Sequence, residues 1–188
     1  KELEENSSLS GINKSPAIFD EQKLRWLSCE YILSMSAEEF KAVALPFLQK
    51  SKAYGRYDED KLLKMLQSRV DVLEDIPSKV DFLEEYGEID PALYFNKKMK
   101  SDAEIAKAVL PKAADVFKNL DKFENAELYA ALVALAQEQG MKNGQVLWCV
   151  RIALTGKENT PGGASEMAEL LGRERSLERL AHAMSLLA

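Results

Sequence analysis

The stretch GQVLWCVRIALTGKENTPGG, residues 144–163, decides how the second half of this chain folds. Its first part is apolar on nearly every side, which predicts a helix buried within a core rather than laid on its surface. One charged side chain, Arg151, interrupts that apolar run, and a polar loop then ends in Pro-Gly-Gly at residues 161–163. A buried charge is costly unless it is paired, and glycines let another group come close to the backbone. The question is whether that group belongs to the protein itself or to a ligand.

Arg151 and the loop after it each allow two interpretations. Arginine suits a partly buried planar contact with a carboxylate, a phosphate or a base edge, and Glu166 or Glu169 could supply the carboxylate from within the chain. The loop Thr-Pro-Gly-Gly at residues 160–163 precedes a predicted helix, whose first N–H groups and positive dipole end can receive a phosphate or a base carbonyl. The alternative is a plain turn that connects two helices.

The rest of the chain also has helical periodicity, and no stretch alternates convincingly at the period of a β-strand, so we expect an all-α protein. Capping boxes begin helices at Ser36 and Ser101, and Asn143 is expected to cap the helix that carries Arg151. Pro46 and Pro111 predict kinks or early ends. Apolar spacing, caps and breakers predict helices over residues 20–35, 36–50, 58–69, 77–83, 101–120, 125–139, 143–155, 164–171 and 173–187.

Residues 86–100 break the helical pattern, and we place a boundary between two helical subdomains there. The first subdomain spans residues 1–95 and the second spans residues 96–188. A chain of 188 residues is long enough to bury a core in such an arrangement. The first residue is not Met, so we expect the chain to be part of a longer protein.

Composition limits the classes of function. The net charge of −6 argues against general nucleic-acid affinity, so a polyanionic partner would need local patches of positive charge. No apolar run is long enough to span a membrane. The single histidine, His182, and two distant cysteines, Cys29 and Cys149, cannot form a Cys/His metal site. The apolar sequence around Cys29 and around Cys149 predicts two buried, reduced thiols, as in a cytoplasmic protein.

No catalytic motif is present. The pair Gly156-Lys157 is not a phosphate-binding loop, because the upstream glycine is missing and Glu158 stands where Ser or Thr would bind magnesium. No nucleophile, histidine and carboxylate occur in a recognisable order, and the dinucleotide-binding glycine motif is absent. On these residues alone the chain is not a catalyst.

Three further side chains are candidates for binding. Arg69 ends the third predicted helix, where it could either bind a ligand or complement the negative end of the helix dipole. Lys23 and Trp26 share one face of the first helix; without a ligand, Trp26 is most simply a core residue and Lys23 a surface residue.

Several motifs occur together in one order: KSPAIFDEQKLRWL at 14–27, RVDVLEDIP at 69–77, GQVLWCVRIALTG at 144–156, TPGG at 160–163 and ELLGRE at 169–174. This series resembles the C-terminal anticodon-binding region of bacterial glutamyl-tRNA synthetases, which are class I aminoacyl-tRNA synthetases. The resemblance covers residues 12–188 and implies an elongated, all-α region of two consecutive helical subdomains.

The family joins glutamate to tRNA with ATP and magnesium, in a Rossmann-type catalytic domain whose two signature motifs are absent from this chain. The resemblance therefore implies the tRNA-reading part of a cytoplasmic glutamate–tRNA ligase, with no cofactor of its own. Its partner would be tRNA-Glu, and also tRNA-Gln in relaxed members, with neither DNA nor a membrane as a partner. We expect a monomer.

The resemblance also implies roles for individual residues. Arg69 matches the arginine that reads the third anticodon base, a cytosine, in discriminating members. The first two anticodon bases would contact Arg151 and the residues Thr160, Pro161, Gly162 and Gly163. Lys23 and Trp26 match a segment that lies along the tRNA body. Gly163 departs from the family pattern, because a bulky apolar residue is frequent there.

The alternative is an all-α protein-interaction module that does not bind RNA, which the acidic net charge favours. That alternative predicts that Arg151 pairs with Glu166 or Glu169 and that the loop at residues 160–163 is packed shut. RNA binding predicts instead that Arg69, Arg151 and the loop lie on one exposed, concave face.

Overall fold

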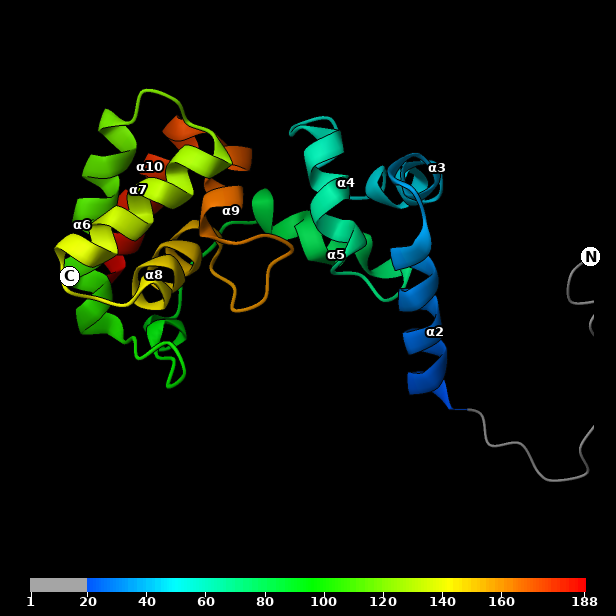
Figure 1. Cartoon of the computed structure of the whole chain (residues 1–188), viewed down its shortest axis with the longest axis horizontal. Coiled ribbons are helices and arrows are strands. Elements are labelled where there is room, and N and C mark those ends of the chain that lie inside the picture. Colours follow the sequence, from blue (N-terminus) through cyan, green and yellow to red (C-terminus); the bar gives the residue numbers. More distant parts are fainter. Residues whose placement is uncertain (1–19) are drawn as a thin grey trace, which may run out of the picture.

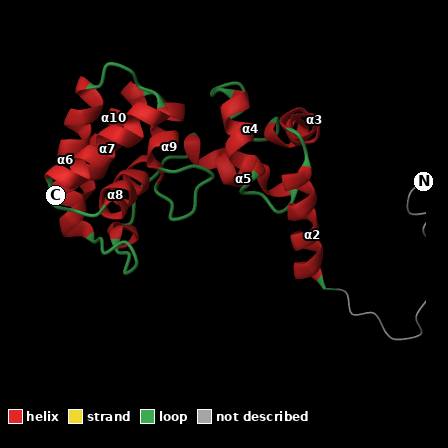
Figure 2. Cartoon of the chain, in the orientation of Figure 1, coloured by secondary structure: helices red, strands yellow, loops and turns green. Residues whose placement is uncertain are grey.

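The computed structural model describes residues 20–188, and these residues are folded into helices (Figures 1 and 2). The first residues of the KSPAIFDEQKLRWL motif and the start of the first predicted subdomain, residues 1–19, lie outside the described residues. Within the described part, the only β-type pairing is an isolated bridge between Asn96 and Ser101. The all-α prediction is confirmed.

The first helices follow their capping signals closely. Asp20 and Asp58 accept hydrogen bonds from the N–H groups of the first turns of α2 and α4, and Ser36 forms the predicted capping box with Glu39 at the start of α3. Helices α2–α5 and their short 3₁₀ neighbours are α2 (Glu21–Ser34), α3 (Ala37–Leu48), α4 (Glu59–Gln67), η2 (Leu73–Asp75), α5 (Ile76–Val80) and η3 (Asp81–Leu83).

The remaining helices gather at the other end of the molecule (Figure 1). They are η4 (Pro91–Tyr94), α6 (Ala103–Asn119), α7 (Asn125–Glu138), α8 (Asn143–Thr155), α9 (Ala164–Leu171) and α10 (Arg173–Leu187). Helix α8 packs against α6, α7, α9 and α10, which explains why its sequence is apolar on nearly every side. Gly156 ends α8 with a positive φ of 64°, a conformation that glycine adopts without strain.

Two predicted helix starts were wrong by one residue. Helix α6 is capped by Asp102, which accepts the N–H of Ile105, whereas Ser101 is buried and donates its hydroxyl to the carbonyl of Tyr94. Asn143 is the first residue of α8 rather than its cap. Both prolines lie inside their helices, Pro46 near the end of α3 and Pro111 in the middle of α6.

The two cysteines differ. Cys149 is buried and its burial raises the pKa of its thiol to about 12, whereas Cys29 is only half-buried, so the prediction of two buried thiols holds for Cys149 alone. No helix within residues 20–188 combines the length and the apolar character that crossing a bilayer requires. The subdomain boundary within residues 86–100 stays a prediction.

Candidate functional site

Arg69 lies in the turn after α4, which ends at Gln67, so the prediction that Arg69 ends this helix is wrong. Leu62, Leu63 and Leu66 of α4 are buried, so the lysines of the same helix, Lys61 and Lys64, remain exposed. Arg69 is exposed too, and its N–H donates to the carbonyl of Leu66. Together these cations line a hollow of about 310 Å³ whose opposite wall includes Pro161 and Glu166. The periodicity of α4 thus places a cluster of positive charge beside the loop.

Arg151 is half-buried on α8, among neighbours that are fully buried. Its guanidinium lies 4.7 Å from the ring centre of Trp148 and donates one hydrogen bond of 2.8 Å to the carbonyl of Glu158. Its Nε is buried and has no hydrogen-bond partner. A buried donor without a partner carries a desolvation penalty, so Arg151 retains unused capacity to donate.

The intramolecular ion pair predicted for Arg151 does not form. Glu166 accepts the N–H of Gly163 at 2.7 Å, and Glu169 contacts Lys61 of α4 at 3.2 Å and accepts the N–H of Asn125. Both carboxylates are therefore engaged elsewhere. The expectation that Glu166 or Glu169 neutralises Arg151 is wrong.

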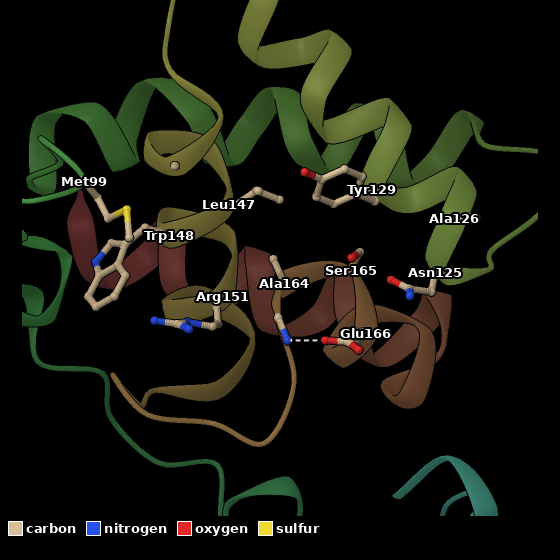
Figure 3. A pocket seen from close by; sticks show the side chains of 12 residues that line it. Met99, Asn125, Ala126, Tyr129, Leu147, Trp148, Arg151, Ala164, Ser165 and Glu166 are labelled. Atoms are coloured by element: carbon tan, nitrogen blue, oxygen red, sulfur yellow. Dashed lines mark hydrogen bonds between the residues drawn. The ribbon is translucent and has the colours of Figure 1, made fainter. Parts of the chain in front are cut away.

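A second hollow of about 480 Å³ opens beside Arg151, between α7, α8 and the start of α9 (Figure 3). Its wall is mostly apolar and aromatic and includes Trp148, Tyr129, Leu147 and Met99 as well as Arg151. Such a wall offers flat surfaces for stacking together with one strong donor, the combination that a planar, polar-edged ligand requires.

The structure shows which groups approach the glycines of the loop at residues 160–163. Pro161 and Gly162 are buried, and a Cβ on Gly162 would lie 2.8 Å from the sulfur of Met65 on α4 and 2.7 Å from the methyl carbon of Met167 on α9. Glycine is needed here because the protein's own helices come close. Thr160 closes the loop by donating its hydroxyl to the carbonyl of Gly162 at 2.7 Å.

Gly163 differs from Gly162, since a Cβ there would meet only Glu166, at 3.5 Å. Its N–H is already taken by the Glu166 carboxylate, which occupies the start of α9. The interpretation of this N–H group as part of a phosphate-binding nest is therefore wrong. The loop contributes to both hollows, since the buried Pro161 lines one and the half-buried Gly163 lines the other.

The two hollows lie on either side of the loop and share Asn125 and Glu166 in their walls. Arg69 and Arg151 are close enough to influence each other: burial lowers the pKa of Arg151 most, and the positive charge of Arg69 lowers it further. We call the surface formed by Arg69, Arg151 and residues 160–163 the arginine face. Two neighbouring arginines that form no ion pair with a carboxylate in the described part of the chain favour an anionic or acceptor-rich ligand.

Lys23 and Trp26 do not belong to the arginine face. They lie on α2, which stands at the far end of the molecule from α7 and α8 (Figure 1). Trp26 is 58% exposed, so its expected place in the core is wrong, whereas Lys23 is an exposed residue as expected. Leu24, Leu27 and Tyr31 are exposed beside it, because α2 packs little of its length against the helices described here.

Several residues of the site were missed from the sequence. Asn125, at the start of α7, contributes to both hollows, and Tyr129 follows it by one helical turn. Lys61 and Lys64, at the i, i+3 spacing, could have been recognised as a polar stripe on the Arg69 helix. Within residues 20–188, no group of three or more His, Cys, Asp or Glu side chains is arranged to hold a metal ion.

Comparison with known proteins gives consistent matches. Residues 36–184 match the family described as anticodon binding domain. A glutamate–tRNA ligase of Clostridium tetani is 42% identical over 169 residues, which are 90% of this chain and 34% of that protein. A glutamate–tRNA ligase of Clostridium kluyveri is 41% identical over 95% of this chain and 37% of its own length. The chain thus spans about a third of the length of the curated relatives it matches.

The fold has a solved counterpart. A crystal structure of a glutamate tRNA ligase from Elizabethkingia meningosepticum, in complex with its amino acid, superimposes on 97% of this chain with a TM-score of 0.72. The chain corresponds to 36% of that protein and is 21% identical to it, which supports the likeness of fold alone.

Proposed function

The chain belongs to the family of anticodon binding domains, and we propose from this premise that its arginine face reads the anticodon loop of a tRNA. The observation that carries the proposal is the placing of two arginines across a loop flanked by two hollows, neither of them in an ion pair with a carboxylate of residues 20–188. An anticodon loop offers splayed bases, whose edges and faces can enter such hollows, and phosphates, which the lysines of α4 can contact.

Arg69 is the proposed reader of the third anticodon base. Its guanidinium is exposed and donor-only, so it suits the O2 and N3 acceptors of a cytosine. Lys61 and Lys64 lie in the same hollow, where they supply positive charge for the neighbouring phosphates. Phosphate contacts position the RNA, and the base contact of Arg69 selects it.

Arg151 and the loop are proposed to read the first two anticodon bases. The half-buried guanidinium of Arg151 can donate to a base edge, while the exposed ring of Tyr129 offers a surface for stacking. Thr160, Pro161, Gly162 and Gly163 set the position of this hollow relative to Arg69. Lys23 and Trp26 are proposed to contact the tRNA body at a distance from the anticodon.

The whole protein is proposed to be a cytoplasmic glutamate–tRNA ligase that attaches glutamate to tRNA-Glu with ATP and magnesium. The names of the relatives support this activity, and the chain corresponds to about a third of their length. Reading a cytosine through Arg69 would favour tRNA-Glu over tRNA-Gln. We propose that the chain itself acts as a monomer.

A titration tests this function directly. The chain is mixed with a fluorescent anticodon stem-loop of tRNA-Glu, and with the same stem carrying a scrambled loop, at low and at physiological salt. We expect tighter binding of the anticodon loop at both salt concentrations and weaker binding of both RNAs at higher salt. Equal affinity for the two RNAs would contradict anticodon reading, and no binding even at low salt would favour the protein-interaction module.

A further inference from the structure

A buried arginine, Arg179 of α10, lies where the two groups of helices meet. Its side chain is only 7% exposed. One arm of its guanidinium donates to the carbonyl of Leu154, at the end of α8, with a distance of 2.7 Å. The other arm donates to the carbonyl of Leu83, in the 3₁₀ turn that follows α5. A single planar fork thus joins the helix that carries Arg151 to the group of helices that carries Arg69.

The carbonyls that this fork holds are at a helix end, where intrahelical partners are missing. Tyr86 completes the arrangement: its hydroxyl donates to the carbonyl of Ala153 at 2.6 Å, and its ring lies 4.2 Å below the Arg179 guanidinium. The last turn of α8 is therefore fixed by Arg179 and by Tyr86. Its position therefore depends on residues outside α8 itself.

Glu84 forms a second connection between the same two groups of helices. Its carboxylate, 13% exposed, accepts from the hydroxyl of Tyr57 at 2.7 Å and from Arg175 of α10 at 2.9 Å, and it also pairs with Arg56. Arg175 donates to the hydroxyl of Tyr57 at 2.6 Å as well. Burial and the hydrogen bond to Glu84 raise the pKa of Tyr57 to about 12, so this hydroxyl remains a donor at neutral pH.

We propose that the clamp formed by Arg179, Arg175, Glu84, Tyr57 and Tyr86 is a positioning device that holds the Arg69 group and the Arg151 helix at one fixed separation. The two groups also touch at the arginine face, where Lys61 contacts Glu169 and Gly162 fits between Met65 and Met167. A loosened clamp lets them pivot about that contact.

A fixed separation matters because one RNA loop must reach both arginines. Two contacts on one rigid body reinforce each other, since the first holds the second at a high effective concentration. When the body becomes flexible, this reinforcement falls, although each contact by itself is unchanged. The clamp thus couples the reading of the third base to the reading of the first two. This consequence for RNA rests on the proposed function, whereas the fixed separation does not.

The first test needs no RNA. Spin labels are attached at Lys64→Cys on α4 and Asn143→Cys on α8, both exposed, in a Cys29→Ser background where the buried Cys149 stays unlabelled. Electron–electron resonance measures the distance distribution between them. We expect Arg179→Lys and Glu84→Gln to broaden it, because lysine cannot hold both carbonyls and glutamine loses its charge.

The matched control for Glu84→Gln is Asp60→Asn. Asp60 also loses its charge, but its partner Lys41 lies in the same group of helices, 2.6 Å away. We expect no broadening in this control. If Arg179→Lys does not fold, the distance distribution of the milder variant Glu84→Gln decides the test by itself. An unchanged distribution in the clamp variants, or equal broadening in Asp60→Asn, would overturn the proposal.

The second test uses two stem-loops, one with the cognate anticodon and one with a guanine at the third position, which can engage the Arg151 side only. In Glu84→Gln we expect affinity for the cognate loop to fall roughly five-fold and affinity for the other loop to stay within about two-fold. An equal loss for both loops would reveal a merely structural role. If the wild-type chain binds neither loop, the proposed function has failed, and the distance measurement still decides whether the clamp exists.

Discussion

The regions around Arg151 and Arg179 show two ways of taking an arginine into an apolar bundle. The guanidinium of Arg179 donates hydrogen bonds to the carbonyls of Leu83 and Leu154. Arg151 donates one hydrogen bond, to the carbonyl of Glu158, and its buried Nε has no partner beside an open hollow. Arg179 is also the more deeply buried of the two, since Arg151 is only half-buried. The second difference between them is whether the guanidinium keeps a hydrogen-bond donor that no protein group accepts.

Replacing Arg179 should have the largest effect on stability. Arg179→Ala leaves two buried carbonyls without their donor and opens a cavity at the end of α8, so we expect a loss of about 3 kcal/mol or more in the free energy of unfolding. Urea unfolding followed by circular dichroism measures it. A loss below about 1 kcal/mol would show that Arg179 is not the structural member of the pair.

Replacing Arg151 should give the opposite pattern. In Arg151→Ala we expect the affinity for the anticodon stem-loop to fall about 10- to 100-fold, the size of one good base contact, while stability changes by about 1 kcal/mol or less. The matched control is Lys112→Ala on α6, which removes an exposed cation away from both hollows. A similar loss of affinity in that control would point to general electrostatic attraction instead.

The sequence was informative wherever the signal was local. Ser36, Asp20 and Asp58 began their helices as predicted, because a cap needs only its own first turn. The prediction from Ser101 failed because the next residue, Asp102, is an equally good cap, and because the Ser101 hydroxyl donates to the backbone carbonyl of Tyr94, which precedes the helix. The choice between two adjacent capping residues therefore depends on contacts outside the helix, which the sequence of the helix does not determine.

The candidate site was predictable only in part. The resemblance brought Arg69 and Arg151 into one site, but nothing local placed Asn125 between them. Arg179 was missed because the segment RERSLERLAHAM reads as an amphipathic surface helix. One signal was available: Arg179 lies one turn after Ser176, on the same side as the apolar residues Leu180 and Ala183, and all four are buried.

The two glycines of the loop offer a sharper comparison within the arginine face. Gly162→Ala puts a methyl group into contact with Met65 and Met167, so we expect a loss of about 1–3 kcal/mol in stability from overpacking. Gly163→Ala is the control, since its new methyl meets only Glu166 at 3.5 Å, and we expect a change within about 0.5 kcal/mol. Thermal unfolding of both variants measures the difference, and equal effects would refute the close approach at Gly162.

The smallest expected effect is the change with pH in the stability that Glu84 contributes. Burial opposes the charge of Glu84, but the hydrogen bonds from Tyr57 and Arg175 and the charges of Arg175 and Arg56 outweigh it and hold the pKa of Glu84 below its ordinary value. A group with a lowered folded-state pKa stabilises the fold above its unfolded pKa of about 4.3, and this stabilisation is lost as the pH falls through the folded-state pKa.

We therefore expect the stability difference between wild type and Glu84→Gln to be full at pH 7 and to shrink as the pH falls below about 4. Urea unfolding at a series of pH values measures it. A difference that stays constant across this range would mean that the Glu84 charge does not hold the clamp.

The most direct test of the account compares two anticodon stem-loops, identical except for cytosine or guanine at the third position, in titrations with wild type and Arg69→Ala. We predict that wild type prefers the cytosine loop by about 1–3 kcal/mol and that this preference disappears in Arg69→Ala, while binding of the guanine loop changes little. Full retention of the cytosine preference in Arg69→Ala would contradict the account, because the arginine face would then not be what reads that base.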